Sequence, residues 1–315
     1  MKKVVAAVVV LGKAVLCFPL LTKRWKTSHL STYLINLLIY GFTFVTIIFV
    51  PFFWTSKLWL DIEQMPSRDN KRVSKLVQRC LDHIPSAASD VFIRFGSILL
   101  WREKDEVFDY LISRPTAHSD DTNTNRVKIP IILKVFIAPI VLAAARVGTP
   151  LIELWQPLPD GYKLKWLPGT GLTVRLWILV ADFQLALGHY YAWVFITGIG
   201  LSLLQRFRKI ATMSQTAPET VVDSLNHDGS ELSKIRRAFE KYGRVAGTYC
   251  FGLLGFCTCH IITSLSDVVY SNGDTSTAAV FERWLNLVWV ATLLGLMSFG
   301  NYISNSVSFD DCLCV

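Results

Sequence analysis

The charged residues divide the chain into long uncharged stretches and shorter polar segments. Three stretches contain no Asp, Glu, Lys or Arg: those between Lys26 and Lys57, between Arg244 and Asp267, and between Arg283 and Asp310. A bilayer core requires about 20 consecutive apolar residues for each helix, and every one of these stretches exceeds that length. They predict membrane-spanning helices near 31–54, 244–266 and 284–306.

Charges interrupt three further apolar segments, which lie near 85–101, 130–152 and 174–205. Asp182 interrupts the last of these segments and Arg146 the middle one. Asp90 and Arg94 interrupt the first, where their spacing of four residues places them on one helical face so that they could pair. Together the six segments predict an all-α polytopic transmembrane bundle of about six spans, built as a single domain over residues 1–315.

Lys and Arg gather on one side of the predicted membrane. Six of them, and no acidic residue, precede the first span: Lys2, Lys3, Lys13, Lys23, Arg24 and Lys26. Cytoplasmic segments of membrane proteins carry an excess of Lys and Arg, so residues 1–30 are expected in the cytoplasm. The loop between the fourth and fifth spans is then cytoplasmic as well, and it is also basic. The loop after the first span is an exception, because it falls on the other side of the membrane and yet holds six Lys and Arg residues, which four acidic residues offset in part.

The N-terminal residues also allow a second interpretation. Lys2 and Lys3, followed by an apolar run over 4–12, fit the start of a secretory signal. Lys13 interrupts that run and no small-residue cleavage site follows it, so the sequence favours a cytoplasmic N-terminal segment.

Two predicted helices are longer than a bilayer requires. Residues 232–270 contain no proline and would extend about 58 Å as a helix, against about 30 Å of hydrocarbon. Leu232, Ile235, Phe239 and Tyr242 form an apolar stripe on the first part of this segment. The fourth span also continues past its apolar part without proline. We therefore expect cytoplasmic helix extensions that pack against each other below the membrane.

The composition agrees with a membrane protein and argues against several other classes. Hydrophobic residues make up 52% of the chain and charged residues 18%, whereas about a quarter of a soluble chain is charged. Basic cytoplasmic loops facing anionic lipid account for the net charge of +8, so no nucleic-acid partner is expected. No phosphate-binding glycine loop, nucleophile elbow or paired-histidine zinc motif is present, so we expect neither enzymatic activity nor a cofactor.

The seven cysteines are odd in number and three of them lie in the fifth span, so they predict no disulfide framework. Cys257, Cys259 and His260 could suggest metal ligands. A helix sends alternate residues to different faces, however, and the sequence offers no second ligand pair. These thiols are interpreted as packing groups, and no metal is expected.

Two segments resemble arthropod gustatory receptors. The first is Val-Val-Leu-Gly-Lys-Ala-Val-Leu-Cys-Phe-Pro-Leu-Leu-Thr-Lys-Arg-Trp at 9–25, followed by Ser-Thr-Tyr-Leu at 31–34. It is similar to the Leu-Gly and Pro stretch that precedes the first span of that family. The second is Ile-Arg-Arg-Ala-Phe-Glu-Lys-Tyr at 235–242, running into Phe-Gly-Leu-Leu at 251–254. Span order, cytoplasmic N-terminus and helix extensions also match, so the resemblance covers essentially the whole chain.

The resemblance implies seven spans, the last of which closes with Thr-Tyr, a few apolar residues and Gln-Phe and lines the ion pathway. The chain stops at Val315, shortly after the sixth predicted span. The expectation is therefore a receptor relative that lacks the last helix. The resemblance further implies a ligand-gated cation channel that assembles as a homo- or hetero-tetramer with related subunits. It would lie in the plasma membrane of sensory neurons and open when a small-molecule tastant enters the outer half of the helices.

Seven polar and aromatic residues in the outer halves of the spans are candidate ligand contacts: Arg146, Glu153, Asp182, His189, Tyr190, Trp193 and His260. Asp182, His189 and Trp193 recur on one face of the fourth span, and a charge at that depth commonly marks function. Small polar ligands need a few directed hydrogen bonds inside an aromatic wall, which this set could supply. The alternative is a structural ion pair, such as Asp182 with Arg146.

Two other classes of membrane protein remain open. A G-protein-coupled receptor would place its N-terminus outside the cell, and the sequence motifs usual for that class are absent. A small-solute transporter would more often show an internal repeat with helices broken by glycine or proline. No such repeat is found in the sequence.

Overall fold

The computed structural model describes residues 2–14, 30–65, 72–104, 107–108, 110–112, 148, 163, 166–216, 221–270 and 277–311. All regular secondary structure in these ranges is helical. The helices are α1 Lys2–Ala14, α2 Leu30–Glu63, α3 Arg72–Lys104, α4 Tyr110–Ile112, α6 Leu172–Thr216, α7 Val221–Tyr270 and α8 Thr277–Asp311. The prediction of an all-α chain is confirmed for this part of the protein.

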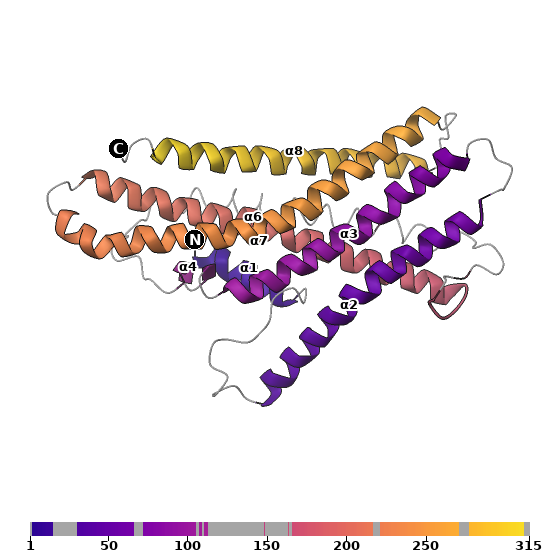
Figure 1. The fold of residues 1–315 in the computed structure, drawn as a ribbon, viewed down its shortest axis with the longest axis horizontal. Helices are drawn as coiled ribbons and strands as arrows, with labels where there is room; N and C mark the ends of the chain where they lie inside the picture. Colours follow the sequence, from indigo (N-terminus) through magenta and orange to yellow (C-terminus); the bar gives the residue numbers. More distant parts are fainter. Residues whose placement is uncertain are drawn as a thin grey trace.

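The long helices form an elongated bundle with two distinct ends (Figure 1). At one end α2 finishes and α3 and α6 begin; we call this the tryptophan end, after Trp54, Trp59 and Trp166. At the other end lie α1, α4, the last turns of α3 and the charged parts of α6 and α7. We call it the basic end, after its exposed Arg and Lys side chains. Both chain termini lie on the side of the basic end in Figure 1.

Close contact between α3 and α7 depends on glycine. The Tyr249 ring of α7 lies so near Gly96 of α3 that a Cβ atom there would be 2.7 Å from two ring carbons. The Tyr249 hydroxyl also lies 3.1 Å from Ser97 Oγ, which keeps the buried ring in place. Only a residue without a side chain allows the two helices to approach this closely.

The core consists of two apolar clusters along the bundle. One joins α1, α3, α6 and α7 near the basic end and includes the edge-on or tilted rings of Tyr191, Phe195, Tyr242 and Tyr249. The other joins α2, α6 and α7 near the tryptophan end. Val5 and Val8 of α1 are fully buried in the first cluster, so the N-terminal helix packs against the bundle.

Two helices of the described chain are long and apolar enough to cross a membrane, judged by length and composition. They are Leu172–Ile210, with 39 residues, and Ser233–Thr263, with 31 residues. They coincide with the fourth and fifth predicted spans. The predicted segments 31–54, 85–101 and 284–306 lie within α2, α3 and α8. The predicted segment 130–152 lies outside the described residues.

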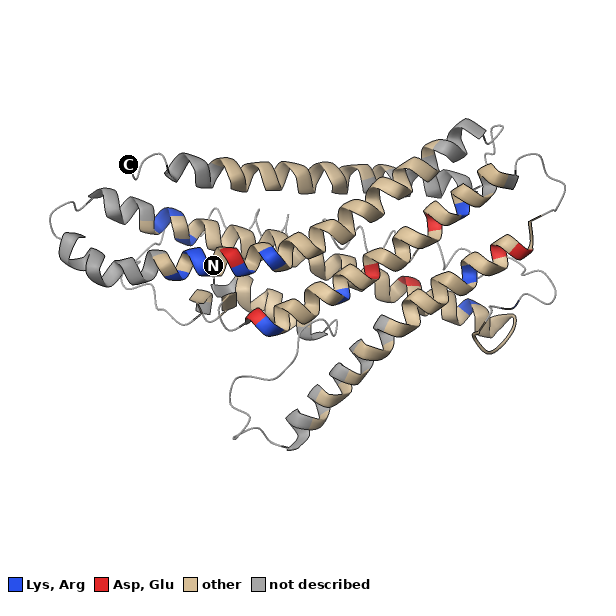
Figure 2. Ribbon diagram, in the orientation of Figure 1, with Lys and Arg blue, Asp and Glu red and all other residues tan. Residues whose placement is uncertain are grey.

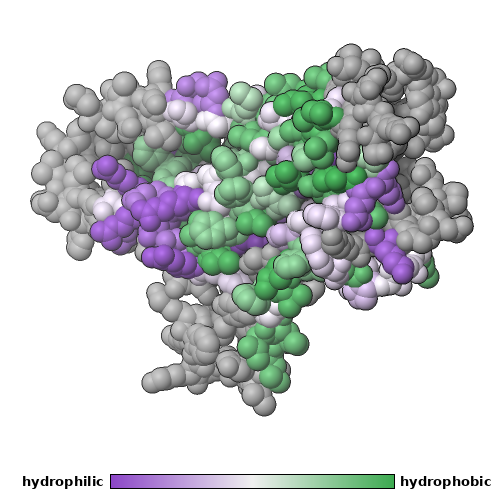
Figure 3. All heavy atoms as spheres, turned by 45° about the vertical axis from the view of Figure 1, so that its right-hand side comes forward, coloured by the Kyte–Doolittle hydropathy of each residue, from purple (hydrophilic) through white to green (hydrophobic). Residues whose placement is uncertain are grey.

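The surface of the bundle is apolar between its two ends. Figure 3 shows hydrophobic side chains across the middle of one face, with hydrophilic groups at both sides. Only 39% of the apolar window of α7 is buried, against 78% for that of α6. Figure 2 shows most Lys, Arg, Asp and Glu positions toward the two ends of the bundle. Asp90, Arg94 and Asp182 are buried.

The predicted packing of the helix extensions is confirmed where side chains are described. Ile235 and Tyr242 are buried, and the Phe239 ring contacts the Phe207 ring of α6 edge-on, with centroids 6.2 Å apart. The α7 helix starts at Val221, earlier than the predicted residue 232. An amphipathic stripe therefore joins α6 and α7 at the basic end, as the sequence pattern indicated.

Candidate functional site

The predicted ligand contacts lie in different surroundings. Arg146 and Glu153 lie outside the described residues. Asp182 and His189 are buried on α6, while His260 is half-buried on α7. The structure thus describes five of the seven candidates.

His189 stands where three helices meet. Its Nε2 atom lies 2.8 Å from Ser89 Oγ of α3, and both side chains are buried. On its other side the imidazole contacts the Phe256 ring of α7, with centroids 4.6 Å apart. A hydrogen bond to α3 and a ring contact to α7 therefore hold this histidine in the interior.

His260 belongs to the same layer. The Phe256 ring also contacts the His260 imidazole, with centroids 4.2 Å apart, and His260 Nε2 lies 3.5 Å from Ser86 Oγ. Ser86 and Ser89 are three residues apart on α3, so both face the layer. The structure thus brings two predicted residues, His189 and His260, into contact with the same phenylalanine ring.

Trp193 does not share the surroundings of His189. Its ring tip lies against Gly295 of α8, where a Cβ atom would be 2.9 Å from the ring. Its indole nitrogen is buried and has no hydrogen-bond partner among the described residues. Tyr190 packs beside the core cluster nearer the basic end. The α6 candidates therefore face different neighbours, because α6 is surrounded on several sides and a helical stripe covers a wide angle.

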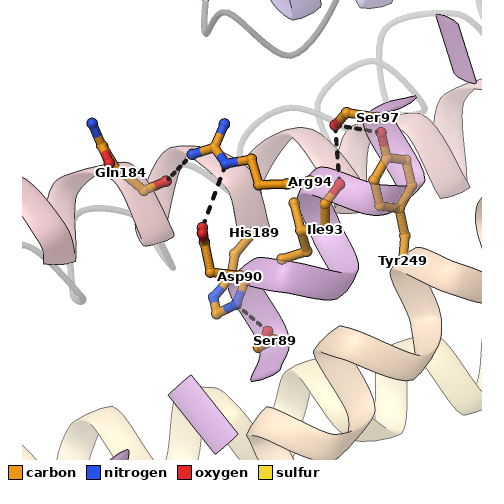
Figure 4. A network of polar contacts seen from close by, with 8 residues as sticks. All are labelled: Ser89, Asp90, Ile93, Arg94, Ser97, Gln184, His189 and Tyr249. Atoms are coloured by element: carbon orange, nitrogen blue, oxygen red, sulfur yellow. Dashed lines mark hydrogen bonds and ion pairs between the residues drawn. The ribbon is translucent and has the colours of Figure 1, made fainter. Parts of the chain in front are cut away.

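A buried ion pair completes this part of the interior and was not among the predicted ligand contacts. Arg94 Nε lies 3.5 Å from Asp90 Oδ1, with the two side chains 2% and 0% exposed. Arg94 Nη2 also donates to the backbone oxygen of Gln184 on α6 at 3.4 Å. Figure 4 shows these groups with Ser89 and His189. The pairing predicted from the spacing of Asp90 and Arg94 is confirmed.

The polar layer comprises Ser86, Ser89, Asp90, Arg94, Gln184, His189 and His260. It contains hydroxyl, imidazole, carboxylate and guanidinium groups within an apolar bundle. Neither Asp90 carboxylate oxygen accepts a hydrogen bond from the described residues, and the Gln184 side-chain oxygen accepts none either. Such groups suit recognition of a polar ligand by hydrogen bonds. The sequence signal that pointed here was the pair of opposite charges inside an apolar segment.

A second buried polar contact joins α2 and α3 at the tryptophan end. His83 Nε2 lies 2.8 Å from Asp61 Oδ2, and Arg79 lies 3.8 Å from the same oxygen. The Trp54 ring stacks on the His83 imidazole, and the Lys57 ammonium lies over that indole. This arrangement links the end of α2 to the first half of α3.

The pKa values of this contact are both lowered. Burial lowers the pKa of His83 below its ordinary 6.5, and the hydrogen bond with Asp61 offsets this only in part. For Asp61, burial alone would raise the pKa. The hydrogen bond from His83 and the charges of Arg79 and Lys57 outweigh that effect and hold the Asp61 pKa below 3.8. At neutral pH the imidazole is uncharged and donates its Nε2 proton to the carboxylate.

The described residues contain no group of three or more His, Cys, Asp and Glu side chains that could hold a metal ion. Within the same part of the chain Cys80, Cys250, Cys257 and Cys259 are free thiols. The site in this part of the molecule is therefore a set of hydrogen-bonding and aromatic groups.

No protein-family model, curated protein or solved structure matches the chain. The class of protein defined by the described residues is an all-helical bundle with two helices able to cross a membrane.

Replacing Arg94 tests the buried ion pair. We expect Arg94→Met to lower the free energy of unfolding by about 3–5 kcal/mol, because the Asp90 carboxylate is left in the interior without its partner. The double variant Asp90→Leu with Arg94→Met should recover most of the loss, since no charge remains buried. Denaturant unfolding of the purified full chain in detergent measures both changes.

Arg102→Met is the matched control for this experiment, because Arg102 lies on the same helix with its side chain 80% exposed. Its effect should stay within about 0.5 kcal/mol. A double variant as unstable as Arg94→Met would contradict the interpretation.

Acidification tests the contact between His83 and Asp61. Both groups have lowered pKa values in the folded protein, so the unfolded chain binds more protons as the pH falls. Stability should therefore decrease as the pH falls below 6.5, where unfolded histidine becomes protonated, and the Asp61 contribution should be lost only below 3.8. The thermal unfolding midpoint in detergent, measured against pH, reports this change. His83→Gln should flatten the first part of the curve, and an unchanged curve would show that another group titrates there.

Proposed function

We propose that this protein is a chemoreceptor subunit of the arthropod gustatory receptor type. In this proposal it crosses the plasma membrane of sensory neurons about six times and contributes to a ligand-gated cation channel that senses small molecules. The observation that carries the proposal is the distribution of polarity: an apolar surface between two charged ends encloses a layer of paired polar groups. The resemblance of the sequence to that receptor family supplies the receptor activity.

The exposed apolar surface supports integration into a bilayer. Large apolar side chains are exposed along the middle of α2, α3, α7 and α8, including Leu38, Phe95, Phe251 and Met297. Contiguous apolar surface of this extent on a soluble monomer marks an interaction site. Lipid would cover the surface on every side at once, and the charged ends would then lie in the headgroup regions.

The order of the helices supports an additional span between α4 and α6. Arg206, near the end of the apolar part of α6, donates to the backbone oxygen of Tyr110 in α4 at 2.7 Å. Trp166, just before α6, contacts Phe52 and Trp59 at the tryptophan end. The chain therefore leaves α4 at one end and enters α6 at the other. A crossing at 130–152 accounts for this, and with α2, α3, α6, α7 and α8 it makes six spans.

The distribution of charge supports a cytoplasmic basic end. Exposed basic residues gather there on α6 and α7, and the acidic Glu103 and Glu240 pair with Lys241 and Arg244. At the tryptophan end Asp61 is engaged by His83 and Arg79. The loop after the first span, which is an exception to the excess of Lys and Arg in cytoplasmic segments, therefore has part of its charge compensated by internal pairs. This supports a cytoplasmic N-terminus.

The polar layer supports recognition of a small polar molecule, the tastant. Two imidazoles, the Asp90 carboxylate and the hydroxyls of Ser86 and Ser89 lie within one level of the bundle, beside Phe256. A ligand with several hydroxyl or amino groups could exchange hydrogen bonds with this set. Channel assembly as a homo- or hetero-tetramer with related subunits follows from the family resemblance.

The location of the two termini tests the architecture. Epitope tags at the N-terminus and after Val315 should be stained only after cells are permeabilised, because both ends follow the basic end of the bundle. A tag inserted within 271–276, between α7 and α8, is the matched control and should be stained on intact cells. An N-terminal tag that is accessible on intact cells would reject the proposal and favour a G-protein-coupled receptor.

Ligand-evoked currents test the receptor activity. Cells that co-express a complete related receptor subunit, which supplies the last helix, and that show surface staining of the 271–276 tag should carry a cation current in response to at least one compound in a panel of sugars, amino acids and alkaloids. His189→Ala should raise the half-maximal concentration about tenfold, which corresponds to loss of one hydrogen bond. Phe183→Leu, at an exposed position on the same helix, should leave it unchanged. Transport of a labelled solute without current would favour the transporter class.

A further inference from the structure

The basic end carries five exposed Lys and Arg side chains that have no role in the proposed ligand recognition. We define the basic patch as Arg208 and Lys209 on α6 and Lys234, Arg236 and Arg237 on α7, all of them exposed. Arg236 and Arg237 form no hydrogen bond or ion pair with the described residues. The carboxylates of the nearby described residues, Glu103 and Glu240, are engaged by other cations.

Two contacts bring the parts of this patch to one level. The edge-on contact of Phe207 with Phe239 aligns α6 and α7 directly beside the patch residues. Figure 2 shows Lys and Arg on both helices at this end. On the other side, Arg208 Nη1 donates to the hydroxyl oxygen of Tyr302 on α8 at 3.2 Å, and its guanidinium lies 5.6 Å from that ring centre. Arg208 therefore connects the patch to α8.

The surface of α8 above this contact is apolar. Met297 and Leu294 are 61% and 58% exposed, and Tyr302 is 46% exposed. At about 1.5 Å per residue, Met297 and Leu294 lie roughly 8 and 12 Å from Tyr302 toward the tryptophan end. A tyrosine with a polar neighbour on one side and apolar surface on the other is typical of a membrane interface.

The depth of the patch also fits a headgroup. The apolar part of α7 begins after Arg244, and Arg236 and Arg237 lie eight and seven residues before it, about 11–12 Å along the axis. Charges interact over about 8–10 Å at physiological salt, and arginine side chains reach several ångströms toward a membrane surface. Guanidinium groups bind phosphate oxygens in pairs, which favours a headgroup with several phosphates over a singly charged one.

We propose that a polyphosphorylated inositol lipid of the inner leaflet binds at this end. Its headgroup lies on Arg208, Arg236 and Arg237, and its acyl chains lie along Met297 and Leu294 of α8. The exposed apolar track on α8 distinguishes a lipid from a free inositol phosphate. The inference rests on the proposed membrane orientation, in which the basic end is cytoplasmic.

Native mass spectrometry of the purified full chain in detergent tests this site. The probes are phosphatidylinositol bisphosphate, phosphatidylserine and phosphatidylcholine. The chain should retain the bisphosphate lipid in preference to the other two. Arg236→Gln with Arg237→Gln should weaken retention about 25-fold, because each basic residue near an anionic headgroup contributes about fivefold. The double lysine variant keeps both charges and loses only the paired phosphate contacts, so it should lose less binding than the double glutamine variant.

Lys163→Gln, at an exposed position beside the tryptophan end, is the matched control and should leave retention unchanged. Excess inositol trisphosphate should fail to displace the lipid, and complete displacement would overturn the assignment to a lipid. Equal retention of the three lipids, or an unchanged result for the double glutamine variant, would overturn the site altogether.

The result of the mass spectrometry does not depend on whether the protein conducts ions, or on which side of the membrane the basic patch faces. A failed lipid experiment would leave the proposed receptor intact, since the epitope tags and currents test that proposal separately. If instead the topology experiment failed, lipid retention in detergent would still be a valid result, but a cytoplasmic orientation of the basic end would not explain it.

Discussion

Burial of the polar face of α3 is the constraint on which the rest of the bundle depends. Its members are Ser86, Ser89, Asp90, Arg94 and Ser97, spaced so that they share one side of the helix. A buried polar group without a partner is costly, so α6 and α7 must present matching groups at matching heights. Gln184, His189 and Tyr249 do so, and their positions determine how the two long helices sit against α3.

The same constraint explains why the described bundle carries its charges where it does. Within its apolar middle, Asp90, Arg94 and Asp182 lie inside, and large apolar side chains lie outside. A helix bundle in water has the opposite arrangement, with charges outward. At the ends, where water is available, Lys and Arg side chains are exposed, and carboxylates such as Asp61 and Glu103 pair with basic groups. A membrane environment reconciles the inward charges with the outward apolar groups.

The candidate recognition groups and the groups that hold the helices together are the same residues. His189 bonds Ser89 and touches Phe256, so a ligand at the polar layer would have to exchange those contacts for its own. This links occupancy to the relative positions of α3, α6 and α7. At the basic end, Arg208 and Tyr302 connect α6 to α8, so lipid bound there would act on the same helices from outside.

The sequence by itself determined the long helices α2, α3, α6, α7 and α8 and their charged ends, because helix formation and apolar length depend on residues close in the chain. It also placed Asp90 beside Arg94, which are one turn apart. It did not predict the helix α1, whose Val5 and Val8 are buried against the bundle. Only the tertiary structure decided that His189 meets Ser89, 100 positions away, while Trp193 faces Gly295 of α8. The reason is physical: helical spacing defines a face, whereas the neighbour of that face depends on rotation and register. The close approach at Gly96 and the pairing of polar groups on α3 with groups on α6 and α7 determine the rotation and the register of the helices.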